Sequence, residues 1–299
     1  MKALTRIEHA LAMAVANGEA PGCPPKLAGA VRHAVFPGGA RIRPQLCLAV
    51  AAACGDEDPE LSSATATAIE LLHCASLVHD DLPCFDDAPT RRGRASVHYA
   101  YGEGLAVLAG DALIVLAFQT LMLGAVRSPQ RLPALIATVA GSVGMPYGAV
   151  AGQAWECESR VNLVDYQRAK TGALFAAATV GGAQAAGAEP EPWRAFGNWL
   201  GEAYQAADDI RDVIGDPRVL GKPVGRDAAL VRPSTASAFG LEAAVDYFDQ
   251  LVVRAIEAIP ECPGAPALRA LVRAESERLV PKSQVAQIAQ VAPLVPAAA

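Results

Sequence analysis

Two short stretches concentrate carboxylates in a chain that is otherwise rich in apolar residues. The first, HDDLPCFDDAPTRRG at 79–93, contains four aspartates and two arginines, and the second, QAADDIRD at 205–212, contains three aspartates. Either stretch alone could be a solvated helix end. Carboxylates that gather on apolar helices raise one another's pKa unless a cation holds them ionised. The presence of two such clusters therefore favours a divalent cation.

The second cluster has helical spacing. Asp208 and Asp212 are four residues apart, so on a helix they lie about 40° apart around the axis and about 6 Å apart along it. They share one face. Asp209 points about 100° away from Asp208, which suits a supporting role better than direct coordination.

The first cluster cannot act as a unit on an ideal helix, which would not place Asp80 and Asp86 on one side. We expect Pro83 to distort the last helical turn and correct this. Carboxylates without His or thiolate partners suit Mg²⁺, which takes one or two protein carboxylates and completes its shell with water and phosphate oxygens. The site therefore indicates a phosphorylated substrate.

Basic residues suited to phosphate accompany the carboxylates. Planar guanidinium groups match phosphate oxygens in bidentate pairs. The candidates follow the first cluster or recur beside glycine and other short residues: Arg91, Arg92, Arg94, Arg41, Arg43, Lys170 and Lys222.

The composition favours packed helices as the scaffold. Of the 299 residues, 52% are hydrophobic but only 5% are aromatic, and few β-branched residues alternate with polar ones. Residues 62–80 lack Pro and Gly and carry apolar side chains at three- and four-residue spacing, as do residues 193–212 apart from two glycines. Both runs end on the acidic clusters. We predict an all-α fold in one domain over 1–299, with a flexible tail after about residue 292.

The bulk properties exclude several classes of protein. A net charge of −6 argues against a nucleic-acid binder, which needs a basic face. Charged residues in the first turns do not resemble a secretion signal, so we expect a cytoplasmic protein. Residues 105–126 are apolar but interrupted by Asp111, Gln119 and Thr120, which predicts a buried core helix and no membrane span. Seven cysteines without a CxxC pair fit reduced thiols.

At this point the motifs resemble those of the trans-isoprenyl (polyprenyl) diphosphate synthases over nearly the whole chain. The matching pieces occur in the family's order: GGARIRP at 38–44, LLHCASLVHDD at 71–81, KTGALF at 170–175, YQAADDIRD at 204–212 and LGKPVGRD at 220–227. FPGGARIRP, the stretch at 79–93 and VAGQAWEC at 150–157 are most similar to the geranylgeranyl diphosphate synthases of purple photosynthetic bacteria.

The resemblance implies a single bundle of long helices around a deep central cavity, in a homodimer, with the acidic motifs facing each other at the cavity mouth. It implies that Mg²⁺, for which Mn²⁺ can substitute, is bound by Asp80, Asp86 and Asp208. The catalytic set is completed by Asp81, Asp209 and Asp212. The allylic diphosphate is expected at Arg91, Lys170, Thr171, Gln205 and Lys222. Isopentenyl diphosphate is expected at Arg43, His73 and Arg92.

The family's chemistry accounts for both halves of the composition. Metal and basic residues would draw diphosphate from the allylic substrate, and the double bond of isopentenyl diphosphate would attack the resulting carbocation. Such a cation needs a dry apolar cavity beneath a charged rim. The small residues Ala75 and Ser76, about 6 to 7.5 Å along the helix before Asp80, leave room for a growing chain. Together with the resemblance to the geranylgeranyl diphosphate synthases, which implies a role in carotenoid or bacteriochlorophyll synthesis, they lead us to expect a twenty-carbon product, with the chain stopped by Leu71, Leu72 or the next helix.

One residue departs from the family pattern, and three other functions stay open. The family has Lys where this chain has Ala40, and we expect either that Arg41 or another nearby base compensates or that isopentenyl diphosphate binds more weakly. The alternatives are a farnesyl diphosphate synthase, a class I terpene cyclase and an inert regulatory subunit of a heteromeric synthase. The basic residues for a second diphosphate argue against the cyclase, and two intact aspartate motifs argue against the inert subunit.

Overall fold

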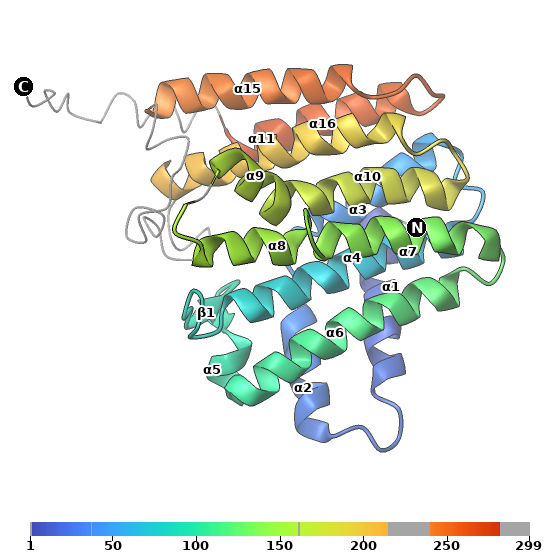
Figure 1. The fold of residues 1–299 in the computed structure, drawn as a ribbon. Helices are drawn as coiled ribbons and strands as arrows, with labels where there is room; N and C mark the ends of the chain where they lie inside the picture. The colour runs from blue at the N-terminus through green and yellow to red at the C-terminus, as the bar shows by residue number, and fades with distance from the viewer. Residues whose placement is uncertain (1, 37, 161, 215–239, 282–299) are drawn as a thin grey trace, which may run out of the picture.

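The computed structural model describes residues 2–36, 38–160, 162–214 and 240–281 (Figure 1). Apart from one two-stranded hairpin, the elements in these ranges are helices, so the predicted all-α class is confirmed. Lys222 and the predicted flexible tail lie outside the described residues. The prediction of one domain over 1–299 includes those residues and stays a prediction.

The elements follow one another with short connections. The first part of the chain contains α1 (Ala3–Gly18), α2 (Pro25–Val35), α3 (Ile42–Ala53), α4 (Pro59–Asp80), β1 (Thr90–Arg91), β2 (Arg94–Ala95), α5 (Val97–Tyr101) and α6 (Glu103–Gly124). The rest contains the 3₁₀ turn η1 (Pro129–Arg131), α7 (Leu132–Val143), α8 (Ala149–Ala154), the 3₁₀ turn η2 (Trp155–Cys157), α9 (Leu163–Gln167), the π-helical turn η3 (Arg168–Gly172), α10 (Ala173–Ala186), α11 (Pro192–Ile214), α15 (Leu241–Glu257) and α16 (Ala265–Leu279).

Helix α4 lies at the centre of the bundle and carries the first acidic motif at its end. It begins with Pro59 at a position that needs no amide donor, and the carboxylate of Asp58 caps it by accepting from the Leu61 amide at 3.2 Å. α4 packs against α6 on one side and α3 and α10 on the other, and α10 in turn contacts α11 (Figure 1). One hydrophobic core cluster joins these helices.

Helices α4 and α6 are each long and apolar enough to cross a membrane, by length and composition alone. In α4, 78% of the most apolar window is buried inside the protein, as expected of a core helix. In α6 the fraction is only 39%. The expectation that residues 105–126 form a buried core helix therefore holds for one face of α6, and the other face is exposed and apolar.

The hairpin that follows α4 was not foreseen. β1 and β2 pair antiparallel with Arg91 opposite Arg94, so Arg92 and Gly93 form the turn. Both turn residues have positive φ, at 54° and 74°, as a type I′ turn requires. The glycine meets this requirement without strain. This tight turn places Arg91, Arg92 and Arg94 close together in the chain after α4.

Candidate active site

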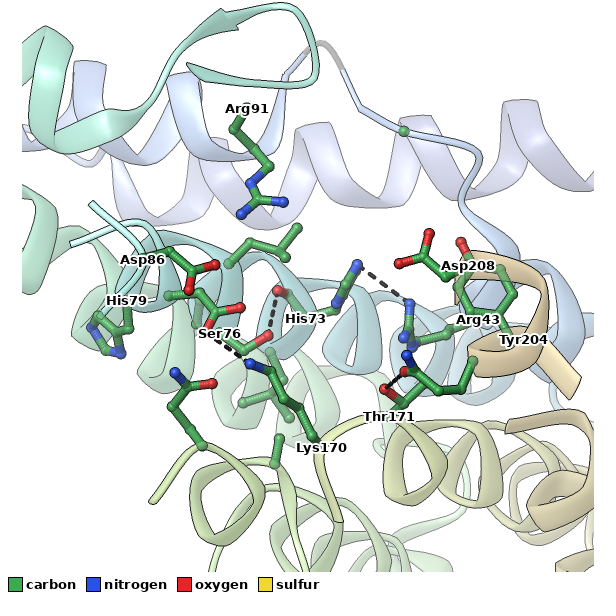
Figure 2. Close-up of a pocket in the computed structure, with 18 of the residues that line it drawn as sticks. Arg43, His73, Ser76, His79, Asp86, Arg91, Lys170, Thr171, Tyr204 and Asp208 are labelled. Atoms are coloured by element: carbon green, nitrogen blue, oxygen red, sulfur yellow. Dashed lines mark hydrogen bonds and ion pairs between the residues drawn. The ribbon is translucent and has the colours of Figure 1, made fainter. Parts of the chain in front are cut away.

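A cavity of about 900 Å³ lies between α4, α6, α8 and α11. Its lining includes most of the predicted site residues: Asp80, Asp86, Asp208, Asp209, Asp212, Arg43, Arg91, Arg92, Lys170, Thr171, Gln205, His73, Ala75 and Ser76. Figure 2 shows Asp86 and Asp208 on opposite sides of this space, with Lys170 and His73 between them. The structure thus brings the two acidic motifs to one cavity, as predicted.

The first acidic motif forms because α4 ends at Asp80. The chain then turns back on itself, with the Asp86 amide donating to the Asp80 carbonyl at 3.0 Å and the Asp87 amide to the Leu82 carbonyl at 3.0 Å. This places Asp86 beside Asp80, which an unbroken helix could not do. The distortion expected near Pro83 is therefore real, and it takes the form of a helix end.

Asp80 is a half-buried carboxylate with few partners. Its Oδ1 atom accepts no hydrogen bond from the described residues, and Lys170 Nζ lies 3.4 Å away as an ion pair. Burial raises the pKa of Asp80 above its usual range, Lys170 opposes this rise, and the nearby charge of Asp86 adds to it. A carboxylate in this position is stabilised in its ionised form by an added cation.

Asp81 points away from the cavity and pairs with Arg91. The Arg91 guanidinium donates to Asp81 Oδ1 through Nη2 at 2.5 Å and through Nε at 3.0 Å. Burial raises the pKa of Asp81, and its hydrogen bond with Arg91 opposes this. Asp81 is not among the described residues that line the cavity, whereas Arg91 is. The ion pair with Asp81 therefore helps to hold Arg91, whose side chain points toward the cavity in Figure 2.

The second acidic motif lies on the last turns of α11. Asp208, Asp209 and Asp212 all face the cavity, so Asp209 is closer to the site than its helical angle suggested. Gln205, one turn earlier, donates to Asp209 Oδ1 at 2.9 Å and accepts from the Thr171 hydroxyl at 2.8 Å. This chain links α11 to the π-helical turn η3, which carries Thr171 and Lys170.

Arg43 is held against two aromatic rings. Its guanidinium carbon lies 4.7 Å from the ring centre of Phe175 and 5.7 Å from that of Tyr204, within the range of cation–π attraction. Its Nη1 lies 3.3 Å from His73 Nε2, and its buried Nε has no hydrogen-bond partner among the described residues. Arg43 thus presents an under-bonded cation to the cavity, which suits an anionic ligand.

The half-buried His73 ring has a lowered pKa, which favours its neutral form. Burial lowers the pKa of His73 well below its usual range, and Arg43 lowers it further. The unfolded chain takes up this proton near pH 6.5 and the folded protein does not, so stability present above that pH is lost as the pH falls below about 6.5. We expect His73→Gln to lose less unfolding free energy than the wild type between pH 7 and pH 5. Urea unfolding at both pH values measures this, and equal losses in the two proteins would contradict it.

The predicted chain-length residues line the cavity wall on α4. Ala75 is 2% exposed and Ser76 donates its hydroxyl to the His73 carbonyl at 2.9 Å, so neither fills the space beside it. Leu72 also lines the cavity, about 12 Å along the helix from Asp80, and Ile114 of α6 and Val143 of α7 face the same space. Leu71, the other candidate on α4 for the cavity floor, is fully buried and not part of the described lining.

Sequence reasoning missed Glu156, Tyr204 and Phe175 as site residues. Tyr204 could have been found, because it lies four residues before Asp208 and so shares its face of α11. Arg41, one of the bases expected to compensate for the missing lysine, is engaged in ion pairs with two glutamates. The Arg41 guanidinium is fully buried and pairs with Glu8 and Glu70, at 2.8 and 2.7 Å.

The described residues fit a magnesium site that is completed by its ligand. No group of three or more His, Cys, Asp or Glu side chains within the described ranges is already assembled to hold a metal. Mg²⁺ needs only one or two protein carboxylates when phosphate oxygens and water supply the rest. The buried Oδ1 of Asp80, with no hydrogen-bond donor there, is the kind of atom that such an ion would satisfy.

Comparison with known proteins identifies the family. The family model described as polyprenyl synthetase matches residues 24–265. The geranylgeranyl diphosphate synthase of Cereibacter sphaeroides is 53% identical over 283 residues, covering 95% of this chain and 98% of that protein. The geranylgeranyl diphosphate synthase of Rhodobacter capsulatus is 48% identical over 276 residues, covering 92% and 95%.

Solved structures with the same fold agree with this. The geranyltransferase of Helicobacter pylori, complexed with magnesium and isoprenyl diphosphate, has a TM-score of 0.77 and 28% identity, covering 93% of this chain and 98% of that one. The geranyltransferase of Legionella pneumophila has a TM-score of 0.77 and 27% identity, covering 92% and 94%. Because the family model and these relatives span most of its length, the chain belongs to the polyprenyl synthetase family, as its motifs predicted, and is a prenyltransferase.

Proposed function

We propose that the protein is a geranylgeranyl diphosphate synthase, which condenses isopentenyl diphosphate with an allylic diphosphate. The observation that carries this proposal is one cavity with two separate places for an anion. Asp80, Asp86 and Asp208 face the space where a metal-bound diphosphate would lie. Arg43, with its unbonded Nε, offers a second cationic surface next to His73. A cyclase has no need of the second place.

The residues divide the work between the two diphosphates. Bound Mg²⁺ would stabilise charge on the departing allylic diphosphate. Lys170 and Arg91 also line the cavity and would stabilise the same negative charge. Thr171 and Gln205 line the cavity as well and hold each other in place through their hydrogen bond. Arg43 and Arg92 would hold isopentenyl diphosphate with its double bond toward the allylic carbon. The proton lost at the end passes to the departing diphosphate.

Product length follows from the wall of the cavity. Ala75 and Ser76 leave the path along α4 open as far as Leu72, Ile114 and Val143. The two similar bacterial enzymes named above are geranylgeranyl diphosphate synthases, which supports a twenty-carbon product. Incubation with isopentenyl diphosphate and dimethylallyl, geranyl or farnesyl diphosphate should converge on geranylgeranyl diphosphate. A series that stops at farnesyl diphosphate would make the protein a farnesyl diphosphate synthase.

The metal proposed for this site is Mg²⁺, with Mn²⁺ able to replace it. Support comes from the carboxylate-only donor set and from the magnesium in the similar Helicobacter pylori complex. Full activity in EDTA would contradict the proposal.

Restoring the family's lysine should strengthen the isopentenyl site. Ala40 is exposed at the cavity edge, and Arg41 is occupied elsewhere. Arg92 already lies close by, because a methyl group on Gly39 would come within 3.0 Å of its Nε. We therefore expect Ala40→Lys to lower KM for isopentenyl diphosphate by no more than about fivefold, the contribution of an exposed ion pair. KM for the allylic substrate is the internal control, and an equal fall in both constants would contradict a local effect.

The proposed homodimer would use the outer face of α6. Leu108, Val115 and Met122 are spaced by seven residues on this face and are each more than half exposed, at 53%, 55% and 56%. Aligned apolar side chains of this kind mark interfaces. We expect Val115→Asp to yield monomers in light scattering, whereas Val253→Asp, at a 53% exposed valine on α15, should not. A wild type that is already monomeric would refute the dimer. The cytoplasmic location stays a prediction from the sequence.

A further inference from the structure

Glu156, in the turn η2, accepts hydrogen bonds from three side chains of the described residues. Its Oε1 accepts from Lys170 Nζ at 2.6 Å and from the Tyr166 hydroxyl at 2.5 Å. Its Oε2 accepts from Gln153 Nε2 at 3.0 Å. The side chain is 17% exposed. Because its donors come from α8, α9 and η3, the carboxylate ties together the segments on one side of the cavity.

Glu156 stands behind Lys170 as seen from the cavity. Gln153, Tyr166 and Lys170 line the cavity, whereas Glu156 is not part of the described lining. The backbone of Lys170 is also held closely, because a Cβ on Gly152 would lie 2.3 Å from the Lys170 nitrogen. Only glycine permits that approach of α8 to η3. Backbone and side chain of Lys170 are therefore both positioned from α8 and η2.

The ammonium of Lys170 is shared unequally between two carboxylates. It lies 2.6 Å from Glu156 Oε1 and 3.4 Å from Asp80 Oδ1, and only the first contact is a hydrogen bond. Asp80 therefore keeps an Oδ1 atom without a hydrogen-bond donor in the described structure. Without the charge on Glu156, Asp80 would remain as an ion-pair partner of Lys170 among the described residues, and the ammonium could close onto it.

We propose that Glu156 is a positioning residue that draws Lys170 away from Asp80 and so leaves the Asp80 carboxylate open to the metal ion. The inference rests on the proposed function for the identity of that metal site. Lys170 then has two possible interactions, and Glu156 favours the first over the second. Lys170 faces the diphosphate end of the cavity, and it competes with the divalent cation for Asp80.

The positioning role of Glu156 can be tested without substrate by measuring Mn²⁺ binding. The electron paramagnetic resonance signal of free Mn²⁺ reports how much of the ion is bound. Glu156→Gln should weaken Mn²⁺ binding roughly tenfold, within the range of coupling between contacting charges. Lys170→Gln should tighten Mn²⁺ binding, although it removes a residue that faces the diphosphate. In the Lys170→Gln background, the effect of Glu156→Gln should fall to less than about threefold.

The double mutant separates positioning from simple attraction between Glu156 and the ion. If Glu156→Gln weakens Mn²⁺ binding as much or more when Lys170 is already absent, the carboxylate acts directly and the proposal is wrong. Glu156→Asp keeps the charge and should recover part of the affinity. Glu158→Gln removes an exposed carboxylate from the same segment and should change nothing. Equal affinities in all variants would also overturn the proposal.

A kinetic measurement provides a second readout. The Mg²⁺ concentration that half-saturates turnover should rise in Glu156→Gln, while KM for isopentenyl diphosphate stays unchanged because Arg43 and His73 are untouched. A merely structural role would alter both constants together. The wild type and the variants could bind Mn²⁺ with the expected order of affinities while the wild type transfers no prenyl group. In that case the proposed function fails and the role of Glu156 stands.

Discussion

Replacing Asp80 or Asp208 by alanine should lower turnover by at least about a hundredfold, the usual cost of removing one group that stabilises developing charge. The two residues reach the cavity from different helices, α4 and α11, and neither can take the other's place. Steady-state rates at saturating Mg²⁺ and both substrates measure the loss.

Folding should survive these changes. Burial raises the pKa of Asp80, which means that the ionised side chain is destabilised in the folded protein before metal binds. Its removal should leave the melting temperature equal to or above that of the wild type. Asp246→Ala, at an exposed aspartate on α15 outside the described lining, is the matched control and should keep full activity. An Asp80→Ala variant with near-normal turnover would show that other residues bind the metal.

The second large effect concerns product length. Ala75→Phe should change the main product from geranylgeranyl to farnesyl diphosphate, because the new ring would project from α4 into the cavity that Ala75 lines. The side chain lies about 7.5 Å along the helix from Asp80, so the diphosphate end is left alone and condensation continues. Chromatography of the dephosphorylated products gives the chain lengths directly.

The control for this substitution is Ser76→Ala, which keeps the same turn of α4 small and should leave the twenty-carbon product unchanged. If Ala75→Phe still makes mostly twenty-carbon chains, the length gauge lies deeper, at Leu72, Ile114 or Val143. A wild type that already stops at fifteen carbons would show that the open turn at Ala75 does not set the length.

The acidic motifs could be predicted because their geometry is local. The four-residue spacing of Asp208 and Asp212 is enough to place both on one face of a helix. The helix end after Asp80 was signalled by Pro83, although the return of Asp86 depends on backbone hydrogen bonds that sequence spacing does not specify. Family motifs then supplied roles for Arg43 and Lys170 that composition alone could not.

The contacts that the sequence could not reveal join distant segments. Arg41 looked available for an anion, but its partners Glu8 and Glu70 come from other helices, and only packing brings them together. Glu156 and Lys170 are fourteen residues apart and Lys170 lies within a π-helical turn, so no regular helical spacing predicts their ion pair. The exposed face of α6 could not be predicted, because apolar residues occur all around this helix and do not indicate which side is covered.

We propose that this cavity condenses an allylic diphosphate with isopentenyl diphosphate. Measuring the inorganic diphosphate that is released tests this most directly. The purified protein is incubated with farnesyl diphosphate and Mg²⁺, with and without isopentenyl diphosphate, and released diphosphate and products are measured together. We predict release only when isopentenyl diphosphate is present, with one diphosphate for each isopentenyl unit incorporated and geranylgeranyl diphosphate as the product. Release from farnesyl diphosphate alone with a cyclic hydrocarbon, or no release under either condition, would contradict the account.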